Sequence, residues 1–316
     1  MEGATPPASA TATTPDAPSA RSAPAGRPAV VVLSSLVARG SVGGRAVVFA
    51  LERMGFPVWF LPTVLLPWHP GHGRASRHVP PADAFAALAA DLARAPWLGE
   101  VGAVLTGYFG SAEQVEAAAG LVAAIKAARP DALYLCDPVI GDQKPDGSGG
   151  LYLPEATAIA IRDRLMPLAD IATPNRFEAG WLSGLPVGST AEAIAAARAL
   201  GPGTVLVTSA PAMMHRSVAT LLVEATRCLQ AEHPLVEGAP NGTGDLLAAT
   251  FLARRLDGMT SEAALPRALG AVFEMVARSV RAGSDELVLA AEQDTILHPM
   301  AQVTVRAIAT PKPRAK

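Results

Sequence analysis

The chain has 316 residues, of which 50% are apolar and 17% charged, so it is long enough to bury the core of one large domain or two small ones. A formal net charge of −2 and the lack of a basic stripe argue against a nucleic-acid partner. The sequence has no run of 18 apolar residues, which argues against a membrane-spanning helix. Two widely spaced cysteines exclude a four-cysteine zinc site and suit a protein of the reducing cytoplasm.

The two ends of the chain differ in composition from the rest. Ala, Pro, Ser, Thr and Gly make up 23 of the first 28 residues, and none of these 28 is aromatic, Leu, Ile or Val. Such a segment cannot bury enough apolar surface to offset the entropy lost on ordering. We therefore expect residues 1–28 to be a disordered tail and residues 309–316 a short frayed end. We expect residues 29–308 to form a single domain between them.

Short apolar runs alternate with helical patterns from residue 29 onward. The runs that predict strands are Ala29–Leu33, Val58–Leu61, Ala103–Leu105, Ala132–Cys136, Ile171–Ala172 and Thr204–Val207. The segments with helical spacing between them are Arg45–Met54, Ala82–Arg94, Ala112–Ala128, Glu155–Leu165 and Ala191–Leu200. This alternation predicts right-handed crossovers and a buried parallel sheet.

The last third of the chain changes this rhythm. Val218–Glu224 and Arg227–Gln230 follow each other too closely for a helix, which predicts an antiparallel hairpin at one edge of the sheet. Two long helical patterns, Asp245–Leu256 and Ser261–Val280, then close the chain. The whole predicts an α/β fold with three layers, α/β/α, and a mostly parallel central sheet. Sheets of this kind bind ligands at the carboxyl ends of their strands.

The strongest local motif is Asn241-Gly-Thr-Gly-Asp245, directly before an apolar helical run. Its glycines let backbone N–H groups turn toward a ligand, and the helix N-terminus adds a partial positive charge. Together these features predict an anion hole for a phosphoryl group, with Asp245 placed to accept a hydroxyl proton. Taken alone, the motif fits an ordinary helix cap, formed by Thr243 or Asp245, equally well.

Polar residues also follow three successive predicted strands. Asp137 comes directly after one strand, and Thr173 after the next, with Glu178 one helical turn farther on. Thr208 follows the third strand. The carboxylates are oxygen ligands of the type that Mg²⁺ prefers, although each of them alone also fits a helix cap or a surface charge. With the anion hole, these strand ends predict a site for nucleotide phosphates.

Two loops remain open to more than one interpretation. His69 and His72 form an H-x-x-H pair, but Pro67 and Pro70 beside them prevent a zinc-type helix. The two prolines therefore favour a histidine pair at the rim of a ligand-binding site, or on the surface, over a metal site. The polar, glycine-rich stretch 142–150 fits either a lid that excludes water from a phosphoryl transfer or a tolerant surface loop.

Eight stretches of the chain resemble the ribokinase-like superfamily and, within it, the pyridoxal kinase family. They are Gly40-Ser-Val-Gly43, Pro62-Thr-Val-Leu-Leu66, Thr106-Gly-Tyr-Phe-Gly-Ser111, Asp137-Pro-Val-Ile-Gly-Asp142, Thr173-Pro-Asn175, Val207-Thr-Ser-Ala210, Gly242-Thr-Gly-Asp245 and Ser284-Asp-Glu-Leu287. The glycine-rich motif is common to the superfamily and indicates only the type of reaction. The Thr-Gly-Tyr and Asp-Pro-Val-Ile-Gly-Asp stretches are narrower and point to kinases of vitamin B6.

The resemblance implies an ATP- and Mg²⁺-dependent kinase that phosphorylates the 5′-hydroxymethyl group of pyridoxal, pyridoxine or pyridoxamine. It implies that Asp245 is the base and that the amides of Gly242, Thr243 and Gly244 form the anion hole. The implied nucleotide and metal residues are Asp137, Thr173, Glu178 and Thr208, with Tyr152 near the metal. Ser35 corresponds to a serine that contacts the pyridine substrate, and members of the family are usually homodimers.

This chain departs from the family pattern on the substrate side. Leu36 and Arg39 stand where the family usually has a polar or His residue and then an aromatic one. The loop from Pro67 lacks the usual Ser-Asn start, and Gly71 stands where one branch carries a His that contacts the substrate ring. His69 and His72 are therefore the candidates to replace that His.

Three other functions fit parts of the sequence less well. Hydroxymethylpyrimidine kinases of the same superfamily typically carry Cys at the position of Asp245. A sugar or nucleoside kinase would leave the stretch Thr106-Gly-Tyr108 unexplained. A non-catalytic protein that binds B6 vitamers fits the altered substrate loop, but the intact Asp245 argues against it.

Overall fold

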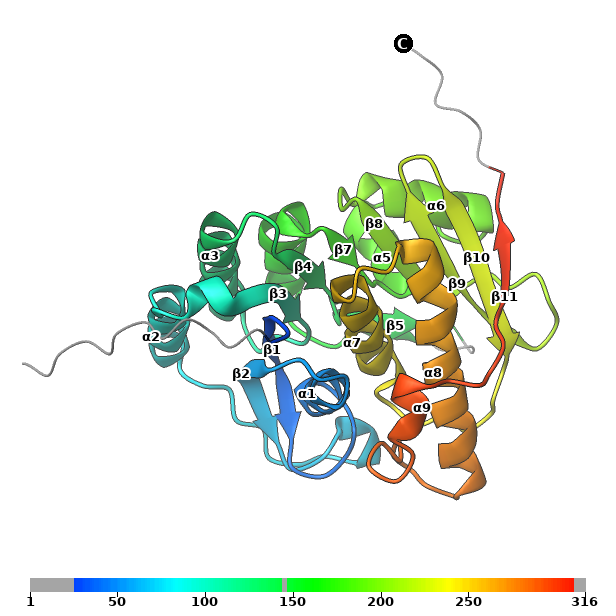
Figure 1. Cartoon of the computed structure of the whole chain (residues 1–316), viewed down its shortest axis with the longest axis horizontal. Helices are drawn as coiled ribbons and strands as arrows, with labels where there is room; N and C mark the ends of the chain where they lie inside the picture. The colour runs from blue at the N-terminus through cyan, green and yellow to red at the C-terminus, as the bar shows by residue number, and fades with distance from the viewer. Residues whose placement is uncertain (1–25, 144–146, 310–316) are drawn as a thin grey trace, which may run out of the picture.

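At the centre of the fold lies a sheet of nine strands, counted over the residues that the computed structural model describes, which are 26–143 and 147–309 (Figure 1). In sheet order the strands are β11 (Thr304–Ala307), β10 (Cys228–Pro234), β9 (Ser217–Glu224), β8 (Thr204–Ala210), β7 (Ile171–Ala172), β4 (Leu133–Cys136), β3 (Val101–Thr106), β1 (Ala29–Val37) and β2 (Val58–Leu66). The strands from β8 to β2 in this order run parallel. Strand β9 is antiparallel to β8, β10 is antiparallel to β9, and β11 is antiparallel to β10. The predicted mostly parallel sheet with an antiparallel hairpin is confirmed.

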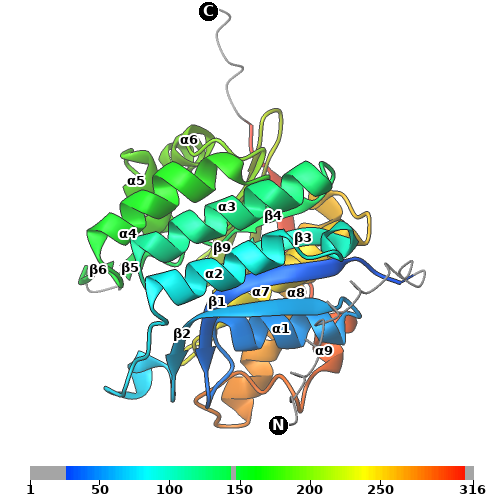
Figure 2. The same ribbon diagram turned by 90° about the vertical axis from the view of Figure 1, so that its left-hand side faces the viewer.

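Helices cover both faces of the sheet, which confirms the three predicted layers (Figures 1 and 2). One face carries α2 (Ala82–Ala93), α3 (Ala112–Ala128), α4 (Glu155–Ala160), α5 (Arg176–Ser183) and α6 (Thr190–Ala199). The other carries α1 (Gly44–Arg53), α7 (Thr243–Leu256), α8 (Ser261–Arg281) and α9 (Asp294–Leu297). Within the described ranges, no helix has both the length and the hydropathy to cross a membrane.

Each strand supplies side chains to two separate cores, one under each helical layer. Along β1, Val31 and Leu33 pack on the α3 side, while Val30 and Val32 pack on the α7 side. This alternation follows from the two-residue period of a strand. Helix α7 is buried around nearly its whole circumference, because it lies between the sheet, α1 and α8.

The edge of the sheet differs from the prediction. Residues Thr304–Ala307 form β11, which pairs with β10, so the β9–β10 hairpin lies one strand inside the edge. We expected the chain to close on its two long helices. Strand β11 is short and largely exposed, so its sequence shows no alternation of buried and exposed residues. Its pairing with β10 is what makes it a strand.

A second, smaller difference lies in the polar stretch 142–150. Its two ends pair as an antiparallel hairpin of β5 (Gly141–Gln143) and β6 (Gly149–Leu151), and residues 144–146 lie outside the described residues. The predicted tail over residues 1–25 and the frayed end over 310–316 lie outside them as well. Contacts with the domain begin before Ala29: the Arg27 guanidinium pairs with Asp257 and lies 4.6 Å from the ring centre of Phe56.

Candidate active site

A cavity of about 440 Å³ opens at the carboxyl ends of the parallel strands, where a doubly wound sheet is expected to bind its ligand. Most of the predicted site residues line it: Ser35, His69, Asp137, Tyr152, Thr173, Glu178, Thr208, Gly242, Gly244 and Asp245. Thr243, Gly71 and His72 are not among the lining residues. The strand ends and the glycine-rich motif therefore meet in one place.

The N-terminus of α7 has the backbone features that an anion site needs. Gly242 precedes the helix with a φ of 94°, and no side chain caps the first turn. A Cβ on Gly242 would lie 2.2 Å from the Ser41 carbonyl oxygen, so only glycine fits there. The Leu246 N–H already donates to the Gly242 carbonyl, which leaves the amides before it for a ligand. The ordinary cap that the sequence left open, by Thr243 or Asp245, is not what forms.

Asp245 lies in the first turn of α7 and is partly buried. Burial raises the pKa of its carboxyl group to about 6, although the Gly43 N–H, which donates to Oδ2 at 2.8 Å, acts in the opposite direction. A carboxylate with a pKa just below neutral is ionised at pH 7 and still basic enough to accept a proton. The geometry and the charge thus suit a general base.

Asp137 lies between the anion site and α5. The Thr173 hydroxyl donates to Asp137 Oδ1 at 2.9 Å. Burial, and then the nearby Glu178 and Asp245 carboxylates, raise the pKa of Asp137 well above its ordinary value. These buried acids repel one another, and a bound cation would relieve that repulsion.

Glu178 has a structural task as well as a place in the cavity. Its Oε2 accepts from the Asn175 amide at 2.8 Å in a capping box of α5, and its Oε1 accepts from the Ile140 amide at 2.8 Å. The helix-cap interpretation of Glu178 is therefore confirmed. Burial still raises the pKa of Glu178 to about 7, so the group adds a second acid of high pKa to the site.

The donor set suits a magnesium ion that is shared with a nucleotide. Asp137, Glu178 and Asp245 offer hard oxygen ligands, the kind that Mg²⁺ prefers. Yet the described residues contain no group of three His, Cys, Asp or Glu side chains placed to hold a metal by themselves. An ion here would take further ligands from phosphate oxygens and water, which is the usual arrangement for Mg²⁺ at phosphates. Tyr152 lines the same cavity, where partial desolvation and then the nearby Asp142 and Glu178 carboxylates raise its pKa to about 12.

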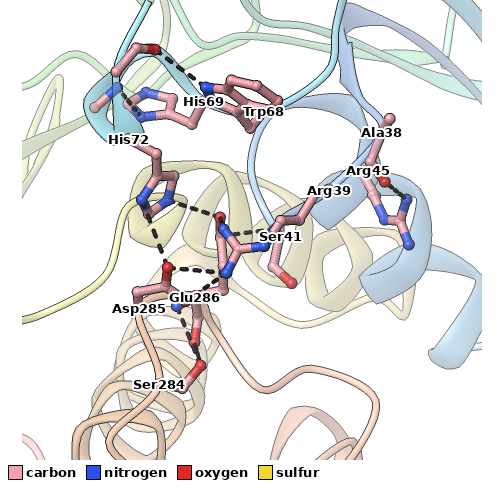
Figure 3. A network of polar contacts seen from close by, with 12 residues as sticks. Ala38, Arg39, Ser41, Arg45, Trp68, His69, His72, Ser284, Asp285 and Glu286 are labelled. Carbon is pink, nitrogen blue, oxygen red and sulfur yellow. Dashed lines mark hydrogen bonds and ion pairs between the residues drawn. The ribbon is translucent and has the colours of Figure 1, made fainter.

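The two loop histidines are separated by their orientation (Figure 3). His69 lines the cavity, and its Nδ1 accepts from the Gly71 N–H at 3.1 Å. Burial, and then His72, lower the pKa of His69, which favours a neutral ring. His72 turns the other way, with its Nε2 2.9 Å from Glu286 Oε1. Gly71 contributes its backbone to the turn and no side chain to the cavity.

Some lining residues were not predicted. Four of them lie within or beside motifs already singled out in the sequence, and those motifs could have indicated them as lining residues: Gly43, Tyr108, Asn175 and Asn241. Arg77 had no such signal, because it follows a loop without periodicity. Its guanidinium donates to the Tyr108 hydroxyl at 3.1 Å and places a cation in the wall of the cavity.

Comparison with known proteins identifies similar kinases over nearly the whole domain. A family model described as phosphomethylpyrimidine kinase matches residues 86–289. The chain is 34% identical over 285 residues to the pyridoxal kinase PdxY of Corynebacterium diphtheriae, covering 89% of this chain and 99% of that protein. It is 35% identical over 286 residues to the pyridoxal kinase PdxY of Rubrobacter xylanophilus, covering 89% and 97%.

Solved structures give the same result. The fold is similar to pyridoxal kinase from Leishmania donovani in complex with ADP, with a TM-score of 0.81 and 32% identity over 89% of this chain and 99% of that one. The complex of that kinase with ADP and pyridoxamine has a TM-score of 0.80 and 31% identity, with the same coverage.

Proposed function

The chain belongs to the pyridoxal kinase family, and from this premise we propose that it transfers the γ-phosphoryl group of ATP to the 5′-hydroxymethyl group of pyridoxal, pyridoxine or pyridoxamine. One observation of the structure carries the proposal. A partly buried carboxylate, Asp245, lies in the uncapped first turn of α7, in a cavity that also holds Asp137 and Glu178. Relatives solved with ADP and with pyridoxamine support both the co-substrate and the acceptor.

The reaction follows from these groups. Asp245 takes the proton of the hydroxyl group while that oxygen forms a bond to the γ-phosphorus. The bond from the γ-phosphorus to the bridging oxygen breaks, and ADP leaves with the electron pair. The amides of Thr243 and Gly244, with the partial charge of the helix end, stabilise the negative charge on the transferred group. The proton is on Asp245 until product release.

Magnesium is part of the proposal. Asp137 and Glu178 would hold the ion through direct or water-mediated contacts, with the nucleotide phosphates completing its shell, and Tyr152 lies near them. The ion supplies positive charge that neutralises the phosphates. Because the carboxylates otherwise repel the triphosphate, we expect ATP and Mg²⁺ together to raise the melting temperature more than the sum of the two alone.

A thermal-shift experiment with ATP alone, Mg²⁺ alone and both tests this expectation. In Asp137→Asn the difference between ATP with and without metal should shrink, because the variant removes one of the repelling charges. Equal shifts for ATP with and without Mg²⁺ in the unmodified protein would reject the metal site.

The choice of substrate is tested by measuring ADP release in parallel on pyridoxal, pyridoxine, pyridoxamine and hydroxymethylpyrimidine. We expect turnover on at least one B6 vitamer above a blank without acceptor. Turnover on hydroxymethylpyrimidine alone would establish the alternative kinase, although an Asp stands at position 245, where those enzymes typically have Cys. Vitamer binding without turnover would establish a non-catalytic binding protein.

The assembly and location follow from the same proposal. The family resemblance supports a homodimer, and a surface hollow lined by Trp59, Leu92 and Trp97 lies at the β2 end of the sheet as a candidate interface. Light scattering should then give about twice the chain mass of 32.4 kDa. ATP as co-substrate and two free, buried cysteines support the cytoplasm as the place of action.

A further inference from the structure

Three segments that are far apart in the sequence meet in one cluster of polar side chains (Figure 3). They are the loop after β1 with Arg39 and Ser41, the turn after β2 with His72, and the segment after α8 with Asp285 and Glu286. None of these five side chains lines the cavity. Their contacts are therefore not used in the reaction described above and need another explanation.

Glu286 is the centre of this cluster. Its side chain is only 11% exposed, and its two oxygens contact both of the other segments. Oε2 accepts from the Ser41 amide at 3.0 Å, and Oε1 lies 2.9 Å from His72 Nε2. The carboxylate also packs against the backbone of Gly40, where a Cβ would lie 2.6 Å from Oε1. Gly40 has a φ of 117°, so glycine is required there on both grounds.

Arg39 and Asp285 add an outer layer to the cluster. The Arg39 guanidinium donates to both oxygens of Asp285, at 2.8 and 2.9 Å, and lies 3.6 Å from Glu286 Oε1. Both members of the Arg39–Asp285 pair are more than half exposed, so this ion pair alone contributes little to the stability of the cluster. The partly buried Glu286 is the member whose removal leaves polar groups without a partner.

Both segments that Glu286 holds lead directly to the site. Two residues after Ser41, the Gly43 amide donates to the proposed base, Asp245. Three residues before His72, the His69 ring lines the cavity. A movement of either segment would therefore alter the cavity, either at the His69 ring or at the amide that contacts the Asp245 carboxylate.

We propose that Glu286, together with Arg39 and His72, is a clasp that positions the His69 turn and the Gly40–Gly43 loop and so sets the affinity for the phosphate acceptor. The identity of the phosphate acceptor in this inference rests on the proposed kinase function, whereas the contacts of the clasp do not depend on that function. Glu286 is a positioning residue and makes no contact with the cavity. Arg39 stands where the family pattern has an aromatic residue, so its charge departs from that pattern, whereas Asp285 and Glu286 lie in a stretch that resembles the family.

The first test is the kinetics of Glu286→Gln, which keeps the size of the side chain and removes its charge. We expect KM for pyridoxal to rise about tenfold, as for loss of a hydrogen bond to a charged group, while KM for ATP stays within twofold. His72→Gln should raise the same KM by a smaller factor. The control is Asp294→Asn, which breaks the 2.7 Å ion pair between Asp294 and Arg53 at the end of α1, two residues that do not line the cavity. It should change neither KM.

The second test does not depend on activity. Arg74 lies in an exposed segment directly after the His69 turn, so trypsin cleavage after Arg74 reports how firmly that turn is held. We expect Glu286→Gln to speed this cleavage severalfold, with cleavage after the exposed Arg216 as the internal reference. Unchanged pyridoxal KM with unchanged cleavage would overturn the clasp, and so would an equal rise in both KM values. If the unmodified protein shows no turnover at all, the proposed function fails, and the cleavage result still decides on the clasp.

Discussion

Replacing Asp245 with Asn is expected to lower kcat by about 10²–10⁴-fold, the usual cost of losing a general base. The fold should persist, because Asn keeps the shape of the side chain and an oxygen that can accept from the Gly43 amide. ATP affinity should not fall, because the change removes a negative charge beside the transferred phosphate and no hydrogen-bond donor. Coupled ADP release measures kcat, the melting temperature reports whether the fold persists, and an ATP titration measures the affinity for ATP.

The pH profile gives the same assignment a second test. Burial raises the pKa of Asp245 to about 6, and the ionised form is the one that accepts a proton. Below this pH the group is protonated, so log kcat should fall as pH falls and reach a plateau above it. The residual activity of Asp245→Asn should lack this acid limb. Near-native turnover of the variant on every B6 vitamer would show that Asp245 is not the base.

Replacing Gly244 with Val is expected to weaken nucleotide binding strongly while the fold survives. A Cβ at Gly244 has no neighbour within 4 Å, and the residue lines the cavity at the first turn of α7. The valine side chain therefore enters the space for the phosphate, at a cost to the helix of less than about 1 kcal/mol. We expect ATP affinity to fall by roughly 10²-fold or more, as measured by calorimetry with a non-hydrolysable analogue.

Gly242 provides the contrasting variant. Its φ is 94°, and a Cβ there would lie 2.2 Å from the Ser41 carbonyl oxygen, so even Gly242→Ala must displace the backbone. We expect this variant to lower the melting temperature, since overpacking costs about 1–3 kcal/mol. If Gly244→Val binds ATP as well as the unmodified protein does, the phosphate does not lie at this helix end.

Local signals in the sequence were sufficient for the fold class and for most of the site. Strands and helices have different periods, so the alternation between Ala29 and Leu200 indicated the layers without knowledge of any contact. Parallel strands end at one edge, so Asp137, Thr173 and Thr208 could be brought together from their positions alone. The turn chemistry of Gly242 and Gly244 is equally local, and it indicated the candidate anion site before helix α7.

Tertiary structure decided what depends on partners that lie far away in the chain. Strand β11 is a strand only because β10 offers its free edge, and no pattern within Thr304–Ala307 shows this. His69 lines the cavity, whereas His72 contacts Glu286, which lies more than 200 residues farther along the chain, and no local pattern distinguishes the two histidines. The raised pKa of Asp245 comes from desolvation by a core that many segments build together. Periodicity and turn preferences are properties of neighbouring residues, whereas desolvation and long-range polar contacts exist only once the layers have packed.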